Sequence, residues 1–315
     1  CATPQDASAL FAGMMDYATV SVNMRGTGCS GGAYDYFEQL QLLDGYDVVE
    51  TVAAQSWVQH HQVGMVGLSY PGISQLFVAA QRPPGLAAIA PMSVIGSTTT
   101  TLLPGGILND GFALSWVKNV LSKAVPYGQG WEQARVDGGD ETCRENQLLH
   151  GQLVDNVAQA RLIEFHDPAQ HDRFDPTNFV GRIEVPTFLT GAWQDEQTGP
   201  YFFLLFDKFT GSDAVRFTAL NGVHVDGFAP EVLAEWHAFL ELFVARRVPR
   251  DPATFRNFSP FIFDEVFKSK QTMPPTKWSS FTSKEEAIAA WKAEPRLNVI
   301  FESGAGDARD LGAPR

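Results

Sequence analysis

The stretch VGMVGLSYPGISQLFVAAQ, residues 63–81, decides the fold of this 315-residue chain. It opens with a short apolar run, residues 63–68, that ends at a glycine-rich turn and therefore predicts a buried strand. Residues 73–81 predict a helix. Between them, GLSYPG sets Ser69 on a turn from strand to helix, where a side chain stands exposed at the end of a sheet. Ser69 is therefore a candidate nucleophile.

The residues that flank Ser69 leave two interpretations open. The GxSxG pattern of a nucleophile turn places its second glycine at position 71, whereas this chain has Pro71 followed by Gly72. Small flanking residues let the backbone turn tightly, and the helix that follows offers N–H groups and a favourable dipole to a developing oxyanion. The alternative is a serine that only caps the helix.

Strands and helices alternate on either side of this stretch. That order predicts an α/β fold, with a parallel sheet and crossover helices. The expected strands are residues 16–24, 86–94, 183–191 and 215–222, and the expected helices lie within 37–60 and over 230–246.

Composition divides the chain further. Residues 96–181 carry threonine, glycine and proline clusters and charged helical stretches without strand alternation, which predicts a helical insertion. The expected domains are 1–95, the first part of the α/β core; 96–181, the insertion; 182–248, the second part of the core; and 249–315, a linker and the start of a C-terminal β domain. The chain begins with Cys and stops in a loop-like sequence, so we expect a fragment or processed chain that is truncated at both ends.

Charge and composition exclude several classes of partner. The 36 acidic residues outnumber 23 basic ones, the net charge is -13, and no basic cluster is present that would bind a phosphate backbone. The apolar content of 44% is that of a soluble globular protein, and no apolar run reaches membrane-spanning length. We expect neither nucleic acid nor a membrane as partner. The compartment, cytoplasmic or secreted, and the oligomeric state stay open.

The cysteines and histidines give no metal signature. Cys1, Cys29 and Cys143 form no CxxC pair, so zinc and redox sites have no support. One disulfide with a free thiol and three free thiols both fit this count, and a Cys1–Cys29 bond would join residues that flank the same expected strand. In HDPAQHD, residues 166–172, the two histidines do not share a helical face. We expect no metal and no cofactor.

A base and an acid follow later strands, where open α/β sheets place their sites. Asp195 follows the strand at 183–191, and His224 follows the strand at 215–222. The order serine, acid, histidine is that of α/β hydrolases. Glu196 is a rival for the acid, and both candidates have the alternative of being ordinary loop residues. The remaining histidines fit less well, because they precede the nucleophile strand, lie in the insertion or lie within a helix: His60, His61, His150, His166, His171 and His237.

Together these motifs resemble the cocaine esterase and X-prolyl dipeptidyl peptidase-like α/β hydrolases, which include α-amino acid ester hydrolases and acylases. MRGTGCSGG, residues 24–32, resembles the family's RGxGxSxG loop, and DGYDVVETVAAQSWV, residues 44–58, resembles the helix after it. GLSYPG resembles its GxSYxG turn, in which this spacing of proline and glycine is normal, and GAWQDEQTG and NGVHVDG resemble its acid and histidine loops. The resemblance covers residues 16–250. It implies an α/β-hydrolase fold with a helical cap, followed by the start of a C-terminal β jelly-roll domain.

The resemblance also implies a mechanism. Ser69 attacks an ester or amide carbonyl, His224 takes its proton, and Asp195 orients the imidazolium. The Tyr70 backbone N–H is expected to be one oxyanion donor. The family's second donor is a tyrosine hydroxyl on a loop that would precede this chain. Trp193 is assigned either to the pocket wall or to packing.

The resulting hypothesis is a serine hydrolase that cleaves ester or amide bonds of small acyl substrates, including short peptides. X-Pro dipeptidyl-peptidase and α-amino acid ester hydrolase or acylase activities are alternatives, and an X-Pro peptidase needs a carboxylate for a free amine. Candidates for that carboxylate are Glu196, Asp226, Asp110 and Asp140. An alternative of another class is a catalytically inactive fragment or binding module. Arg25 is expected to form an ion pair that ties its loop to the core.

Overall fold

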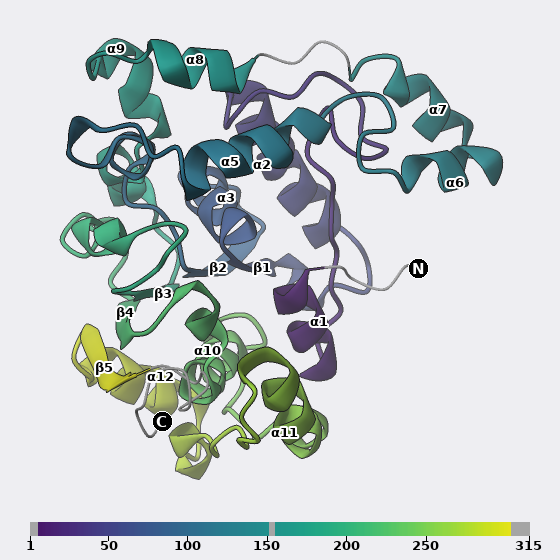
Figure 1. The fold of residues 1–315 in the computed structure, drawn as a ribbon. Helices are drawn as coiled ribbons and strands as arrows, with labels where there is room; N and C mark the ends of the chain where they lie inside the picture. Colours follow the sequence, from purple (N-terminus) through teal and green to yellow (C-terminus); the bar gives the residue numbers. More distant parts are fainter. Residues whose placement is uncertain (1–5, 151–154, 304–315) are drawn as a thin grey trace. The chain divides into compact units, whose positions relative to one another are not determined.

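The computed structural model describes residues 6–150 and 155–303 (Figure 1). The chain forms two compact units. The core unit comprises Cys1–Val20, Tyr46–Ser97 and Pro176–Arg315, and the helical unit comprises Ser21–Gly45 and Thr98–Asp175.

The core unit is built on a parallel sheet of five strands that follow one another in chain order. These strands are β1 (Val63–Leu68), β2 (Leu86–Met92), β3 (Thr187–Ala192), β4 (Val215–Asn221) and β5 (Leu297–Ser303). β2 and β3 are buried along their whole length, as strands of a parallel sheet covered on both faces are. Because all strands run the same way, their carboxyl ends meet at one edge of the sheet.

Helices of the core unit pack on this sheet through apolar side chains. α3 (Tyr70–Ala79) contacts β1 and β2, and α10 (Pro230–Phe243) contacts β2 and β3. The ring of Phe239 in α10 lies 5.8 Å from that of Phe188 and 5.7 Å from that of Trp291, centroid to centroid. The remaining helices and 3-10 turns of this unit are α1 (Ala7–Met14), α11 (Ala253–Phe267), α12 (Lys284–Ala293), η1 (Gln59–His61), η5 (Pro176–Asn178), η6 (Val180–Arg182), η7 (Pro200–Leu205), η8 (His224–Phe228) and η9 (Lys277–Ser280).

The described residues of the helical unit contain no strand. Its elements are α4 (Thr98–Leu102), η2 (Pro104–Gly106), α5 (Phe112–Asn119), η3 (Leu121–Lys123), α6 (Glu132–Asp137), α7 (Glu141–Gln147), α8 (Asn156–Leu162), α9 (Pro168–His171) and η4 (Asp172–Phe174), while α2 (Gln39–Ala53) begins in this unit and ends in the core unit. None of the helices in the described ranges is both long and apolar enough to span a bilayer.

A disulfide joins Cys29 to Cys143 within the helical unit. Beside it, Asn146 Nδ2 donates to the carbonyl of Cys29 (2.9 Å), and Gln147 Nε2 donates to the carbonyl of Gly28 (2.7 Å). These bonds hold the glycine-rich loop, residues 24–32, against α7. The suggested Cys1–Cys29 bond is therefore wrong, and Cys1 itself lies outside the described residues. Nothing local in the sequence pointed to Cys143, because it lies 114 positions from its partner.

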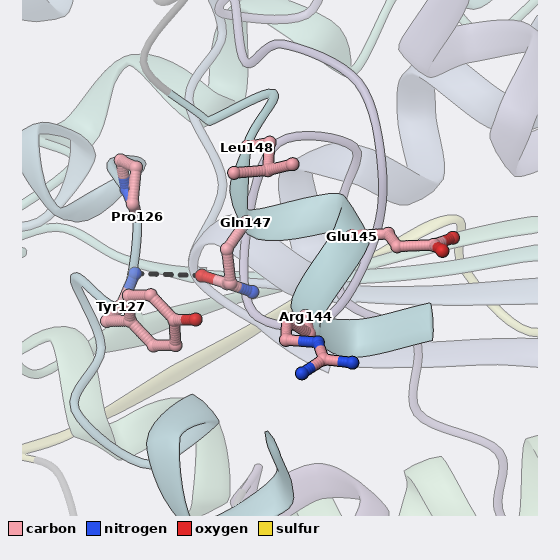
Figure 2. Close-up of a pocket in the computed structure, with 6 residues that line it drawn as sticks. All are labelled: Pro126, Tyr127, Arg144, Glu145, Gln147 and Leu148. Carbon is pink, nitrogen blue, oxygen red and sulfur yellow. Dashed lines mark hydrogen bonds between the residues drawn. The ribbon is translucent and has the colours of Figure 1, made fainter. Parts of the chain in front are cut away.

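The helical unit also contains an ion pair in its glycine-rich loop and a surface pocket. Arg25 forms an ion pair with Asp44 at 2.6 Å, Nε to Oδ2, but both residues belong to this unit, so the pair does not tie the loop to the core as predicted. A pocket of about 430 Å³ opens beside α7, and the backbone N–H of Tyr127 donates to Gln147 Oε1 (2.8 Å) at its wall (Figure 2). The pocket is lined by Pro126, Tyr127, Arg144, Glu145, Gln147 and Leu148, and none of the predicted site residues is among them.

The strand predicted over residues 16–24 is wrong. Residues 18–24 have no regular secondary structure, and Val20 and Val22 are 53% and 55% exposed. β-branched residues favour a strand only where a neighbouring strand and a covering layer receive them. The five-stranded sheet of the described chain does not include this segment.

Residues 249–315 were expected to open a β domain, and their described part, 249–303, differs from that prediction. It forms α11, η9 and α12, and β5 then pairs in parallel with β4, so the segment extends the existing sheet. The phenylalanines explain the helix, since Phe255, Phe263 and Phe267 recur at helical spacing and are buried. Residues 304–315 lie outside the described part.

Candidate active site

Ser69 sits on a strained turn between β1 and α3. Its backbone angles are φ 67° and ψ −129°, a region that non-glycine residues rarely adopt and that costs on the order of 1–3 kcal/mol. Hydrogen bonds hold it there: its N–H donates to the carbonyl of Met92 (2.8 Å), and its carbonyl accepts from the N–H of Ile73 (2.8 Å). Such strain is found where a side chain has to be presented at a fixed place, as at a nucleophile.

The glycines around Ser69 allow this turn by their lack of a side chain. A Cβ on Gly67 would lie 2.5 Å from the carbonyl carbon of Pro71. A Cβ on Gly72 would lie 2.7 Å from the carbonyl oxygen of Met92 and 2.8 Å from that of Gly67. The position that must stay small is therefore 72, while Pro71 is exposed in the first turn of α3. This explains why the departure from the strict GxSxG pattern leaves the turn intact.

Asp195 and His224, predicted from chain order, are in contact. The Asp195 carboxylate oxygens lie 2.9 and 2.8 Å from His224 Nδ1, and the two residues are 6% and 4% exposed. Asp195 Oδ1 also accepts from the backbone N–H groups of Gln197 (2.8 Å) and Thr198 (2.7 Å). A contact of this kind can orient an imidazole and fix its tautomer.

These contacts also set the charge state of the acid. Burial alone raises the pKa of Asp195, but the hydrogen bond and charge of His224 and the hydrogen bonds from Thr198 outweigh it, so the pKa lies below its ordinary value. A carboxylate that accepts several hydrogen bonds is stabilised in its ionised form. Asp195 is therefore ionised at neutral pH.

The backbone of His224 is held on both sides. Its N–H donates to Glu196 Oε2 (3.0 Å), and its carbonyl accepts from the hydroxyl of Ser93 (2.8 Å). Asp226 closes the turn by accepting from the N–H of Val223 (2.8 Å). Glu196, the rival acid, thus contacts the main chain of the histidine. Ser93 was missed in the sequence, where a single serine after a buried strand gives no signal.

The remaining pair, Ser69 and His224, is not joined by a hydrogen bond. Within the described residues, the Ser69 hydroxyl has no hydrogen-bond partner, and His224 Nε2 is buried without one. Hydrogen bonds between a nucleophile and its base are often long in an unliganded enzyme and shorten when substrate binds. The nitrogen that a base would use is thus not engaged elsewhere.

Tyr70 and Trp193 lie in the same unit. Tyr70 is the first residue of α3, so its backbone N–H belongs to the helix end that carries the positive dipole. Trp193 follows β3 and is 39% exposed, with its ring 5.8 Å from that of Phe202 and 5.3 Å from that of Phe203. It therefore packs against η7 with part of its face uncovered.

Of the acids considered for an amine site, two belong to the helical unit. Asp140 caps α7 by accepting from the N–H of Cys143 (3.0 Å) and pairs with Arg135, so it has a structural role. Asp110 lies in the loop before α5. Glu196 and Asp226 belong to the core unit, where Glu196 accepts from the N–H of His224 and Asp226 accepts from that of Val223.

The segment HDPAQHD forms a small cluster in the helical unit. His166 Nε2 lies 2.9 Å from Asp172 Oδ1, and ligand atoms of His166, Asp172 and Asp175 lie within 4.8 Å of one another. His171, the second histidine of the motif, instead accepts from the N–H of Asp167 (2.9 Å). Asp175 already accepts from Thr99.

The profile of the X-Pro dipeptidyl-peptidase (S15 family) matches residues 12–226, a range that includes Ser69, Asp195 and His224. No curated protein matches the chain.

Two crystal structures of a CocE/NonD family hydrolase from Staphylococcus aureus share the fold. One is 20% identical with a TM-score of 0.53 and is aligned over 70% of this chain and 35% of its own. The other is 19% identical with a TM-score of 0.51 and is aligned over 70% of this chain and 36% of its own. This chain thus spans about a third of the length of those hydrolases. The parallel sheet with its helices is an α/β-hydrolase fold, and the chain belongs to the X-Pro dipeptidyl-peptidase (S15) family of hydrolases.

Proposed function

We propose that this chain carries a Ser69–Asp195–His224 triad that hydrolyses ester or amide bonds of small acyl substrates. The observation that carries the proposal is the buried contact between Asp195 and His224 Nδ1, at 2.8 and 2.9 Å. The strained turn of Ser69, at the end of another strand of the same sheet, supports it. An orienting acid, a base with its second nitrogen unengaged and a presented serine are the parts that nucleophilic catalysis requires.

The chemistry follows from these positions. His224 Nε2 takes the proton of Ser69 while Oγ forms a bond to the substrate carbonyl carbon. The oxyanion that results is stabilised by the Tyr70 N–H at the start of α3. When the carbonyl re-forms, the bond to the leaving oxygen or nitrogen breaks, and His224 gives its proton to that atom. Water then repeats the sequence on the acyl-enzyme and releases the acid.

The buried, ionised Asp195 supports the charged form of the base. It accepts the Nδ1–H of His224 and stabilises the imidazolium that forms when Nε2 takes a proton. Substitution of Asp195 by Asn would present an amide to Nδ1 and favour the wrong tautomer. We propose this role for Asp195 over Glu196, whose carboxylate contacts the His224 main chain.

Carboxylic esters are the first candidate substrates, because their cleavage requires no group beyond the triad. X-Pro peptides are the second, because the matching family is that of X-Pro dipeptidyl-peptidase. Exposed Trp193 is proposed as part of the wall that meets the acyl group.

The test is covalent labelling by a fluorophosphonate, with the modified peptide located by mass spectrometry. We expect the label on Ser69 and its loss in His224→Ala. Hydrolysis of a p-nitrophenyl ester and of an X-Pro p-nitroanilide by the labelled and unlabelled protein then separates the two substrate classes. A folded protein that takes no label at Ser69 would overturn the proposal and favour an inactive binding module.

A further inference from the structure

The last residue of β2 and the residue after it contact both turns of the proposed triad. The carbonyl of Met92 accepts the N–H of Ser69 (2.8 Å). The hydroxyl of the next residue, Ser93, donates to the carbonyl of His224 (2.8 Å), 131 positions along the chain. One dipeptide is therefore bonded to the main chain of the nucleophile and to that of the base.

Ser93 is itself held in an unusual conformation. It is 1% exposed, its φ is 50°, and its N–H donates to the carbonyl of Thr190 in β3 (2.9 Å). A non-glycine residue at positive φ is strained and persists only where its surroundings fix it. Glycine would relieve that strain, but glycine has no hydroxyl to donate.

Close packing surrounds the same dipeptide. A Cβ on Gly227, in the histidine turn, would lie 3.1 Å from Ser93 Oγ and 2.8 Å from Leu68 Cδ1. A Cβ on Gly72, in the nucleophile turn, would lie 2.7 Å from the Met92 carbonyl oxygen. Both turns therefore pack closely against the carboxyl ends of β1 and β2, at positions where a side chain would clash.

From this arrangement we infer that Ser93 is a positioning residue: its hydroxyl fixes the His224 main chain so that the imidazole keeps its bond to Asp195 and its reach toward Ser69. The inference rests on the proposed function for its catalytic consequence. Ser93 touches neither substrate nor the reacting atoms. It acts through the turn that carries the base.

The test compares two variants with a matched control. Ser93→Ala removes the hydroxyl, and Ser93→Gly removes it while relieving the positive φ, so that one of them folds even if the other is unstable. Thr187→Val is the control, because Thr187 is also buried and its hydroxyl also donates to a carbonyl, that of Val185 (3.2 Å). Thr187 is the first residue of β3, at the end of the strand away from the proposed site.

The first readout needs no activity. Proton NMR of the protein with ¹⁵N-labelled histidine should show a downfield Nδ1–H signal of His224, which is assigned by its loss in His224→Gln. We expect both Ser93 variants to shift or broaden this signal and Thr187→Val to leave it in place. An unchanged signal in both Ser93 variants, an equal change in the control, or a wild-type protein without the signal would each overturn the inference.

The second readout is the rate of Ser69 labelling by the fluorophosphonate. We expect both Ser93 variants to react about tenfold more slowly or worse, because small displacements of a catalytic group are costly to rate, while the control keeps the wild-type rate. Wild-type rates in both Ser93 variants would contradict the inference. If the wild-type protein takes no label while the Ser93 variants still move the His224 signal, the proposed function fails and the positioning role stands.

Discussion

Ser69 and His224 occupy two turns at the same edge of the sheet, and the two turns are fixed in different ways. The serine turn is set by its own neighbours, since Gly67, Pro71 and Gly72 meet one another within six positions of sequence. The histidine turn is held by residues that are distant in the sequence: Glu196, Asp195 and Ser93, which lie 28, 29 and 131 positions from His224. A local change should therefore damage the serine turn as a structure, whereas the histidine turn should fail first as a catalyst.

The largest expected effect, on kcat/KM, comes from breaking the contact between Asp195 and His224. Replacing Asp195 by Asn should lower kcat/KM for an ester about 10⁴-fold, because the amide favours the wrong tautomer of His224. Kinetic assays with a p-nitrophenyl ester measure this, with Glu196→Gln as the matched control in the same loop. We expect the control to lose less than about tenfold, since Glu196 is exposed and its hydrogen bond to the His224 N–H competes with water. Equal losses in the two variants would contradict the assignment of the acid.

The next effect tests the serine turn. Gly72→Ala should lower the free energy of unfolding by about 1–3 kcal/mol or more, because its Cβ would meet the backbone of β1 and β2. Pro71→Ala is the neighbouring control and should change it by less than about 1 kcal/mol, since Pro71 is exposed. Urea unfolding monitored by circular dichroism gives both values. If the two variants are equally stable, position 72 is not the point of close approach.

A smaller effect of opposite sign is expected at Ser69, the proposed nucleophile. Ser69→Gly should stabilise the fold by about 1 kcal/mol, because glycine adopts φ 67° and ψ −129° without strain. Ser74→Gly, an ordinary position on α3, should instead destabilise by about 0.5–1 kcal/mol. Thermal and urea unfolding check the signs. A destabilised Ser69→Gly protein would show that the turn stores no strain.

The smallest expected effect is on the pH dependence of the free energy of unfolding, which should differ between variants of the two turns. The pKa of Asp195 is lower in the folded chain than in the unfolded chain, so its ionised form adds stability above the unfolded value. That contribution should be lost as pH falls below about 4 and through the folded pKa. Unfolding free energies from pH 6 to pH 3 should thus converge for wild type and Asp195→Asn, whereas the difference between wild type and Gly72→Ala should not change. A pH-independent difference for Asp195→Asn would contradict the shift.

Much of the core could be predicted because its signals are local. The apolar runs that became β1, β2, β3 and β4 end at turns, and their order predicts a parallel sheet. Asp195 and His224 became candidates because each directly follows such a strand. Chain order alone then placed them side by side, since carboxyl ends of parallel strands share one edge.

Features that depend on distant partners were missed or predicted wrongly. Val20 and Val22 favour a strand by composition, but no neighbouring strand of the described sheet receives them. Ser93 and the Cys29–Cys143 pair gain their roles only when segments more than a hundred positions apart meet. β5 resembled the start of a new domain because three α-helices, two 3-10 turns and their loops separate it from its partner, β4.

The most direct test of the central claim is a crystal structure of the protein after reaction with the fluorophosphonate. It measures whether a serine fixed by its neighbours and a histidine fixed from a distance form one catalytic unit. We predict a phosphonate bonded to Ser69 Oγ, with His224 Nε2 within about 3.2 Å of that oxygen and a phosphonyl oxygen on the Tyr70 N–H. A bond at another residue, or an adduct at Ser69 with the imidazole turned away from it, would contradict the account.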